Sequence, residues 1–168
     1  KKATEIYCEK YVEDSLRMEY SYAFAENKYP GAPEWRVHTI DEKPFEINGV
    51  KIIPIRGRHY KLPVLGFRFG NIAYCTDMNH IAEEEFEKLK GLDHFVINCV
   101  RRGRHISHFS LEGALAVAEK VRAKHTWLTH LSHQLPAYTE LASELPENTL
   151  PAYDGLVIEQ EQGLCPRR

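Results

Sequence analysis

The chain has 168 residues, of which 43% are hydrophobic and 27% charged, and its net charge is −2 with histidine neutral. This composition is typical of a globular protein, and we expect one domain over residues 1–160 followed by a tail at 161–168. The slight negative charge argues against a nucleic-acid partner or an anionic membrane surface. The sequence also lacks an apolar run of roughly 18 residues, the length that spans a bilayer.

The first 40 residues predict a strand, a helix and a second strand. Residues 3–8 form a short β-prone run, and residues 9–25 carry apolar side chains at close to helical spacing. Two prolines and a glycine in residues 26–34 end this helix, and residues 35–40 alternate as a strand.

From residue 45 the pattern changes to hairpins and then to alternating strands and helices. Asn48-Gly49 and Gly70-Asn71 each separate two β-prone runs, which predicts two hairpins. The order favours an α/β fold with a mixed sheet. The predicted helices are 82–89, 110–124 with Ser110 as N-cap, and 136–145; the predicted strands are 93–100, 125–130 and 156–160.

Four cysteines are spread along the chain, and none belongs to a C-x-x-C pair. This spacing argues against a cysteine zinc site and against a disulfide framework. Cys75 and Cys99 lie in apolar runs, so we expect buried free thiols and a cytoplasmic location.

Three potential metal ligands each follow a predicted strand. His59 ends "KIIPIRGRH", Asp77 ends "NIAYCTD" and His130 ends "HTWLTH". Because the carboxyl ends of strands meet at one edge of an α/β sheet, these side chains could converge on a divalent ion such as Zn, Mn or Fe. His108 lies just before the N-cap of the helix at 110–124 and could reach the same edge.

Each of these residues also has a structural interpretation. The histidines could be polar strand ends that bond to the backbone, and Asp77 could cap the turn before the next helix. For His133, three residues after His130, the structural interpretation is favoured. The coincidence of three strand ends is what favours a site.

Several stretches together resemble the metallo-β-lactamase superfamily, and within it the phosphodiesterases similar to phosphoribosyl cyclic phosphate phosphodiesterase. They occur in family order over residues 50–160: "GRHYKLPVLGFRF", "IAYCTDMNHI", "SHFSLEGALAVAEKV", "THLSHQ" and "AYDGLVIE". The resemblance implies an αββα sandwich with its metal site along one edge of the two sheets. It also implies a metal-dependent hydrolase of a small cyclic or diester phosphate.

The resemblance implies a role for each candidate residue. His59, Asp77 and His130 match metal ligands, with Asp77 bridging two ions, and His108 matches a proton donor or phosphate-binding histidine. The cofactor would be two divalent ions, Mn or Zn with Fe as a further candidate. Such ions generate hydroxide near neutral pH and neutralise charge on the phosphate.

The most diagnostic motif of that superfamily, His-x-His-x-Asp-His, does not occur in this sequence. Without its four ligands we expect weak or partial metal binding and little hydrolysis by this chain alone. We therefore expect an N-terminally incomplete αββα sandwich, roughly the C-terminal two-thirds of one. Its uncovered sheet surface favours self-association, for example as a homodimer.

The basic stretch "RRGRH" precedes His108, so Arg101, Arg102 and Arg104 could contact a substrate phosphate or simply form a solvated loop. Two other functions compete with the phosphodiesterase. One is a hydrolase of the same fold for a thioester, a lactone or an RNA end, of which RNA is disfavoured by the negative charge. The other is an inactive truncated module that serves in binding or assembly.

Overall fold

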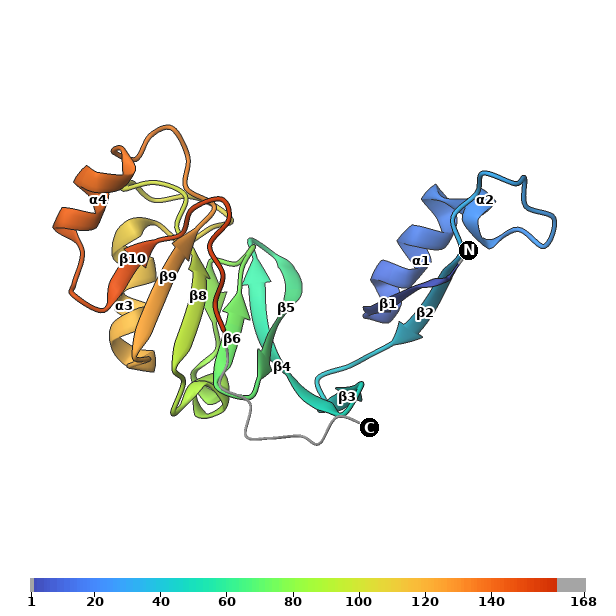
Figure 1. Cartoon of the computed structure of the whole chain (residues 1–168), viewed down its shortest axis with the longest axis horizontal. Helices are drawn as coiled ribbons and strands as arrows, with labels where there is room; N and C mark the ends of the chain where they lie inside the picture. Colours follow the sequence, from blue (N-terminus) through green and yellow to red (C-terminus); the bar gives the residue numbers. More distant parts are fainter. Residues whose placement is uncertain (1, 160–168) are drawn as a thin grey trace. The chain divides into compact units, whose positions relative to one another are not determined.

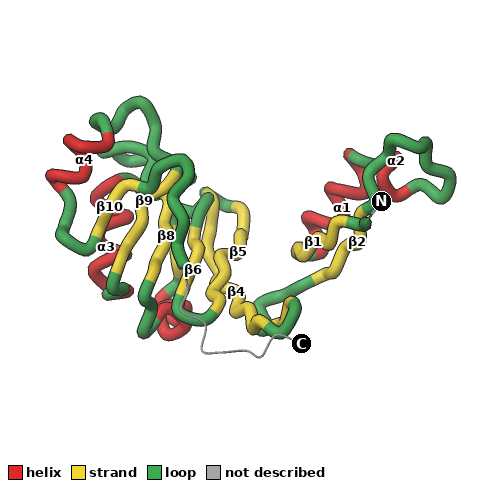
Figure 2. Tube along the Cα trace, in the orientation of Figure 1, coloured by secondary structure: helices red, strands yellow, loops and turns green. Residues whose placement is uncertain are grey.

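The computed structural model describes residues 2–159, and the chain divides into two compact units, Lys1–Phe45 and Glu46–Arg168. Figures 1 and 2 show the elements of both units. That one domain covers residues 1–160 stays a prediction, and the predicted tail at 161–168 lies outside the described residues. No helix in the described part of the chain combines the length and apolarity needed to cross a membrane.

The smaller unit is a β–α–β arrangement. Its parallel strands are β1 (Thr4–Cys8) and β2 (Trp35–Thr39), and its helices are α1 (Lys10–Glu19) and α2 (Ser21–Phe24). Two parallel strands cannot be joined by a tight hairpin turn, and the two helices supply the longer crossover that they need.

The helix predicted at 9–25 is interrupted at Tyr20, whose φ of −116° and ψ of 42° leave the helical region. The rings of Tyr20 and Phe24 both pack edge-on against Trp35 of β2, with ring centroids 5.5 and 5.8 Å away. Packing of these aromatic rings against β2 therefore overrides a continuous helical pattern.

The larger unit is built on one mixed sheet, which confirms the predicted α/β class. The strands lie in the order β10-β9-β8-β6-β5-β4-β3, with β7 paired to β4. The pairs β4–β5 and β5–β6 are antiparallel, whereas β6, β8, β9 and β10 run parallel. The strands are β3 (Phe45–Ile47), β4 (Val50–His59), β5 (Leu62–Phe69), β6 (Ile72–Cys75), β7 (His80–Ile81), β8 (His94–Asn98), β9 (His125–Thr129) and β10 (Thr149–Pro151).

The strand predicted at 156–160 is wrong for residues 156–159, which are not in a strand, and Gln160 lies outside the described residues. The edge of β9 is instead occupied by β10, which pairs with it in parallel. The backbone N–H of Leu156 donates to the carbonyl of Tyr153, which closes a turn immediately before the segment that was predicted to be a strand.

One face of this sheet is covered by helices. They are the 3₁₀ helix η1 (Glu83–Leu89), where an α-helix was predicted, α3 (Leu111–Val121) and α4 (Tyr138–Glu144). Alternate residues of the strands, such as Phe95 and Ile97, pack with Leu89, Ala114 and Leu141 in one core. The predicted N-cap is confirmed, because Ser110 Oγ accepts the backbone N–H of Gly113 at 3.2 Å.

The predicted buried thiols are confirmed. Cys75 and Cys99 are both 0% exposed and free, and each sits in or next to a core strand. Burial disfavours the thiolate and raises the pKa of Cys75 to about 12 and that of Cys99 to about 11. Both thiols are therefore packing groups, not nucleophiles.

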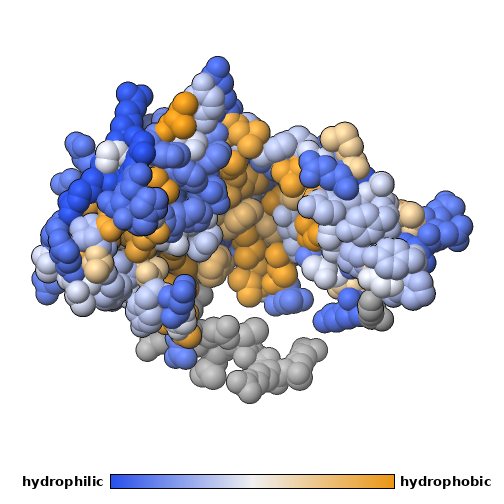
Figure 3. All heavy atoms as spheres, turned by 90° about the horizontal axis from the view of Figure 1, so that it is seen from above, coloured by the Kyte–Doolittle hydropathy of each residue, from blue (hydrophilic) through white to orange (hydrophobic). Residues whose placement is uncertain are grey.

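The opposite face of the sheet also carries apolar side chains. Tyr74, Val96 and Trp127 are register neighbours on β6, β8 and β9, and they alternate with the residues of the helix-covered core. Tyr74 is 45% exposed. Figure 3 shows that hydrophobic residues reach the surface of the larger unit between hydrophilic ones.

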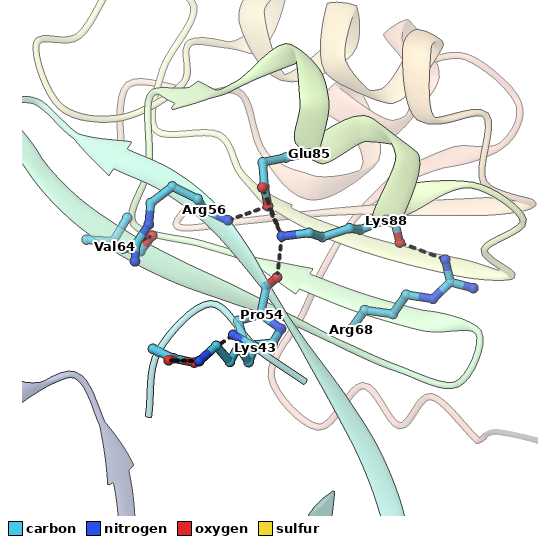
Figure 4. A network of polar contacts seen from close by, with 8 residues as sticks. Lys43, Pro54, Arg56, Val64, Arg68, Glu85 and Lys88 are labelled. Atoms are coloured by element: carbon cyan, nitrogen blue, oxygen red, sulfur yellow. Dashed lines mark hydrogen bonds and ion pairs between the residues drawn. The ribbon is translucent and has the colours of Figure 1, made fainter. Parts of the chain in front are cut away.

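A buried carboxylate attaches η1 to the hairpin of β4 and β5 (Figure 4). Glu85 is 6% exposed, and its oxygens accept the backbone N–H of Arg56 at 2.7 Å and the Lys88 ammonium at 2.7 and 2.8 Å. Lys88 Nζ also donates to the carbonyl of Pro54 at 3.1 Å. Since β4 ends at His59, this network holds in place a strand that carries a candidate ligand.

We expect Glu85→Gln to lower the free energy of unfolding by about 1 to 3 kcal/mol, because it leaves the Lys88 ammonium without its charged partner in a half-buried position. Urea unfolding measures the change. Glu84→Gln, an exposed neighbour on the same helix, is the matched control and should change stability by less than about 0.5 kcal/mol. Equal effects of the two substitutions would contradict the role given to Glu85.

At the other end of the parallel strands, His94 accepts a hydrogen bond from the indole N–H of Trp127 at its Nδ1, 3.2 Å away. Its ring stacks on that of His125, with centroids 5.3 Å apart. Burial first, and then the neighbouring His125 charge, lower the pKa of His94; Asp93 opposes this shift and Lys124 adds to it. The neutral ring is therefore the form that fits this packing.

Because the folded protein binds a proton at His94 less readily than the unfolded chain, this group stabilises the fold fully above about pH 6.5 and progressively less below it. We expect the free energy of unfolding to fall between pH 7.5 and 5.5, and His94→Gln to reduce that fall. Urea titrations at the two pH values test this. His133→Gln, an exposed loop histidine, should leave the pH dependence unchanged.

Candidate metal centre

The register of the parallel strands brings Asp77 and His130 to the same edge of the sheet. Cys75 of β6 pairs with Ile97 of β8, and Ile97 pairs with Leu128 of β9. Asp77 and His130 each follow two residues later, and His130 Nε2 lies 3.3 Å from Asp77 Oδ2. Both residues have left-handed backbone conformations, with φ of 54° and 58°. Such strain is concentrated at functional sites, where it aims a side chain.

His59 and His108 complete the cluster from two other segments. His59 is the last residue of β4, and His108 lies in the loop before α3. Their Nε2 atoms are 3.3 Å apart, and His108 Nδ1 is 4.0 Å from Asp77 Oδ1. Burial, followed by the His59 charge, lowers the pKa of His108 and favours its neutral ring.

Among residues 2–159, one group of at least three histidine, cysteine or acidic residues could hold a metal ion, and it consists of His59, Asp77 and His108. Their ligand atoms all lie within 4.8 Å of one another. His130, named with His59 and Asp77 from the sequence, contacts the same carboxylate. The structure thus gathers all four candidates.

This donor set fits a divalent metal ion. Three imidazoles and one carboxylate suit Zn or Mn. The Nε2 atoms of His59 and His108 face each other. When both rings are neutral, one Nε2–H can donate to the other nitrogen, or both nitrogens can offer lone pairs to a cation. In addition, His108 Nδ1 is buried without a hydrogen-bond partner.

Two backbone bonds of Met78 connect the Asp77 turn to its surroundings. Its N–H donates to Oδ1 of the fully buried Asn98 at 3.0 Å, and its carbonyl accepts the N–H of Phe109 at 3.0 Å. Phe109 directly follows His108. Met78 directly follows Asp77, and its carbonyl binds the residue that directly follows His108. The positions of Asp77 and His108 are therefore coupled through Met78.

The loops around the cluster are held by two further side chains. Nδ1 of His105 accepts the backbone N–H groups of Ser107 and His108 at 3.3 and 3.2 Å. Asn79 bridges two loops, since its Oδ1 accepts the N–H of Tyr60 at 3.1 Å and its Nδ2 donates to the Ile106 carbonyl at 2.9 Å. The segment before His108 is thereby tied to the residue that follows His59.

The three arginines named from the sequence point to different surroundings. Arg101 donates to the carbonyls of Gly103 and Arg104, so it braces its own loop. Arg102 pairs with Glu144 of α4 and lines a cavity along α3 that contains none of the candidate ligands. The Arg104 guanidinium has no partner within residues 2–159 and lines a cavity close to the cluster.

Sequence reasoning did not single out Tyr60, Asn79 or Ile106. All three line this cavity of about 640 Å³. Tyr60 and Ile106 also line a second cavity, which includes His59. The adjacency of Tyr60 to His59 and of Asn79 to Asp77 was visible in the sequence, but their exposure and contacts depend on how the loops meet.

Comparison with known proteins places this geometry in a family. The model of the beta-lactamase superfamily domain matches residues 1–131, and the chain belongs to this superfamily. The fold is that of the metallo-β-lactamases, and the superfamily is one of metal-dependent hydrolases. The superfamily and fold that the sequence motifs indicated are thus confirmed.

Two of the proteins similar to the chain share at least 30% identity with it. A diphosphatase of the PhnP family has a crystal structure with a TM-score of 0.84, 32% identity, and coverage of 92% of this chain and 57% of that one. An octanoyltransferase of Porphyromonas gingivalis is 36% identical over 162 residues, which are 95% of this chain and 33% of that protein. The chain thus spans about a third of the curated relative and little more than half of the diphosphatase.

More distant structures share the fold alone. The metallo-β-lactamase fold protein YhfI of Bacillus subtilis has a TM-score of 0.69 at 14% identity and covers 94% of this chain and 65% of that one. The human short-form tRNase Z has a TM-score of 0.65 at 18% identity, with coverage of 95% and 68%. A shared fold at this level of identity does not indicate a shared function, so the function has to be inferred from the residues of this chain.

We expect Asn79→Asp to loosen one loop and spare the other. The carboxylate still accepts the N–H of Tyr60 but has no proton to donate to the Ile106 carbonyl. Hydrogen exchange should therefore speed up over residues 101–107, whereas the Tyr60 amide stays protected. Asn79→Ala is the reference and should expose both. Unchanged exchange in the 101–107 loop would show that the side chain does not hold it.

Proposed function

We propose that this chain carries the metal centre of a phosphodiesterase that acts on a small cyclic or diester phosphate. The observation that carries the proposal is the convergence of His59, Asp77, His108 and His130 at one sheet edge. The 32% identity to a diphosphatase of the PhnP family supports a phosphorus–oxygen bond as the target.

His59, Asp77 and His130 would hold divalent metal, Zn or Mn with Fe as a further candidate, and Asp77 would bridge two ions in a complete site. Bound metal would supply hydroxide near neutral pH and neutralise charge on the phosphate. These three side chains would hold one ion, and the absent His-x-His-x-Asp-His string would furnish further ligands for a complete two-metal site. We therefore propose weak or partial loading of this chain alone.

His108 is proposed as the proton donor to the leaving oxygen. The protonated ring would give its proton to the leaving oxygen and return to the neutral form that burial favours, and its half-buried position near Asp77 keeps it at a defined place relative to the ligands. Arg104 is proposed to contact the substrate, because it is the arginine of "RRGRH" that has no partner within the described residues. We also propose that the protein is cytoplasmic, that its substrate is a small phosphate compound, and that it self-associates as a homodimer.

Acyl hydrolysis is a second candidate. It is favoured by the 36% identity to part of an octanoyltransferase, a name that implies an acyl substrate for that protein. A metal centre of this kind can polarise a thioester carbonyl as well as a phosphoryl oxygen. Parallel assays with bis(p-nitrophenyl) phosphate and an octanoyl thioester decide between the two, since each candidate predicts turnover of one substrate only.

Metal content tests the proposed ligands. Dialysed chain should retain less than one equivalent of Zn²⁺ or Mn²⁺ by elemental analysis, and His59→Ala and His130→Ala should remove most of it. His108→Ala should retain the metal, and His133→Ala is the control for a surface histidine. Loss of metal in the His108 variant would make this residue a ligand in place of a proton donor.

Turnover tests the role of His108. When a segment that carries the His-x-His-x-Asp-His ligands is supplied, and with bis(p-nitrophenyl) phosphate and saturating metal, His108→Ala should lower kcat about 100- to 10,000-fold at unchanged metal content. His133→Ala should leave kcat unchanged. Metal binding without any turnover of either substrate class would overturn the enzymatic proposal and leave a binding or assembly module.

A further inference from the structure

Two adjoining cavities lie beside the metal centre and share the same wall. One, of about 640 Å³, is lined by Tyr60, Asn79, Arg101, Arg104, His105 and Ile106. The other, of about 580 Å³, contains His59 and is lined in addition by Lys61, Leu62 and Ser107. Tyr60 and Ile106 belong to both cavities, so a molecule bound in the cavity that contains His59 lies against these two side chains.

Three apolar side chains that line these cavities are largely exposed: the shared residues Tyr60 and Ile106, and Leu62 of the cavity that contains His59. The exposed fractions are 50% for Tyr60, 49% for Leu62 and 65% for Ile106. Exposed apolar groups beside polar catalytic residues are typical of ligand sites, where they receive the apolar part of the ligand. The Lys61 ammonium lies 5.4 Å from the centroid of the Tyr60 ring, and the ring remains half exposed.

This wall is also preorganised. Asn79 bonds to the backbone N–H of Tyr60 and to the carbonyl of Ile106, so the two residues are held by one side chain. Tyr60 has a left-handed φ of 59°. Because binding costs less when the receiving groups are already ordered, this geometry favours binding at the wall.

The floor of the larger cavity is cationic. No carboxylate lines it, whereas two arginines and one histidine do. Arg101 is engaged by loop carbonyls, but the guanidinium of Arg104 has no partner in the described part of the chain. His105 accepts backbone N–H groups at Nδ1, which leaves its proton on Nε2 as a donor. The cavity therefore offers donors to an anion.

We propose that these residues form a subsite for a flat ring, a nucleobase or another aryl group, on a phosphate-bearing substrate. The ring lies against Tyr60 and Ile106, and Arg104 balances the negative charge of the phosphate. The proposal rests on the proposed phosphodiesterase function and narrows its substrate class to nucleotides and aryl phosphates, as opposed to simple sugar phosphates.

The test is calorimetric titration of the full chain in the presence of Zn²⁺ with AMP, phenyl phosphate and ribose 5-phosphate, each of which carries one phosphate monoester. AMP should bind about tenfold more tightly than ribose 5-phosphate, as stacking of one base predicts. Tight binding of phenyl phosphate as well would define a general aryl site, and tight binding of AMP alone would define a nucleobase site. Equal affinity for all three would overturn the proposal.

Variants separate the ring from the charge. Tyr60→Asn should abolish the preference for AMP without changing the affinity for ribose 5-phosphate, since asparagine tolerates the left-handed backbone at this position. Ile106→Ser should reduce the preference, and Tyr60→Phe should keep it. Arg104→Gln should weaken all three ligands by a similar factor.

Met18→Ser is the matched control, because Met18 is 76% exposed in the smaller unit and should have no effect. An equal loss of AMP and ribose 5-phosphate binding in Tyr60→Asn would show a structural role and overturn the subsite. The same experiments distinguish failure of the phosphodiesterase proposal from failure of the ring-subsite proposal. Preference for AMP without turnover of bis(p-nitrophenyl) phosphate refutes the phosphodiesterase and leaves the ring subsite, whereas turnover without that preference refutes the subsite alone.

Discussion

The parallel register of β6, β8 and β9 determines where the candidate ligands can meet. Hydrogen bonding between neighbouring strands places Cys75, Ile97 and Leu128 at one level, so the residues that follow them emerge at one edge. Asp77 and His130 then turn through left-handed backbone conformations and approach to 3.3 Å. A shift of one residue in either strand pair would turn the side chains to the other face and break up the cluster.

The cluster of imidazole rings at this edge contributes little to the stability of the fold. His59, His108 and His130 surround one exposed carboxylate, and their mutual repulsion when protonated would cost stability. Instead, burial lowers the pKa of His108 and favours its neutral ring, the form that can accept a proton or bind a metal. Titratable groups with perturbed environments that cluster in this way are characteristic of functional sites.

The chemistry of the site and the choice of substrate depend on different parts of the molecule. The strand ends supply the proposed ligands, and the fold that positions them is that of a superfamily of metal-dependent hydrolases. The loops after β4 and β8 supply the surroundings: an apolar wall at Tyr60 and Ile106, and an unpaired cation at Arg104. Asn79 joins these loops to each other, so the proposed substrate wall and the loop that carries His108 are linked through one amide.

The sequence by itself determined the α/β class, both hairpins and the N-cap at Ser110, and it singled out the four residues that the structure brings together in the candidate centre. These follow from local rules, since turn chemistry, hydrophobic periodicity and polar residues at strand ends are all visible along the chain. Only the tertiary structure decided the interruption at Tyr20, the pairing of β10 with β9, and the separation of Arg102 from Arg104. The physical reason is that packing between distant segments sets each of these features, and the energy of such contacts is absent from any local pattern.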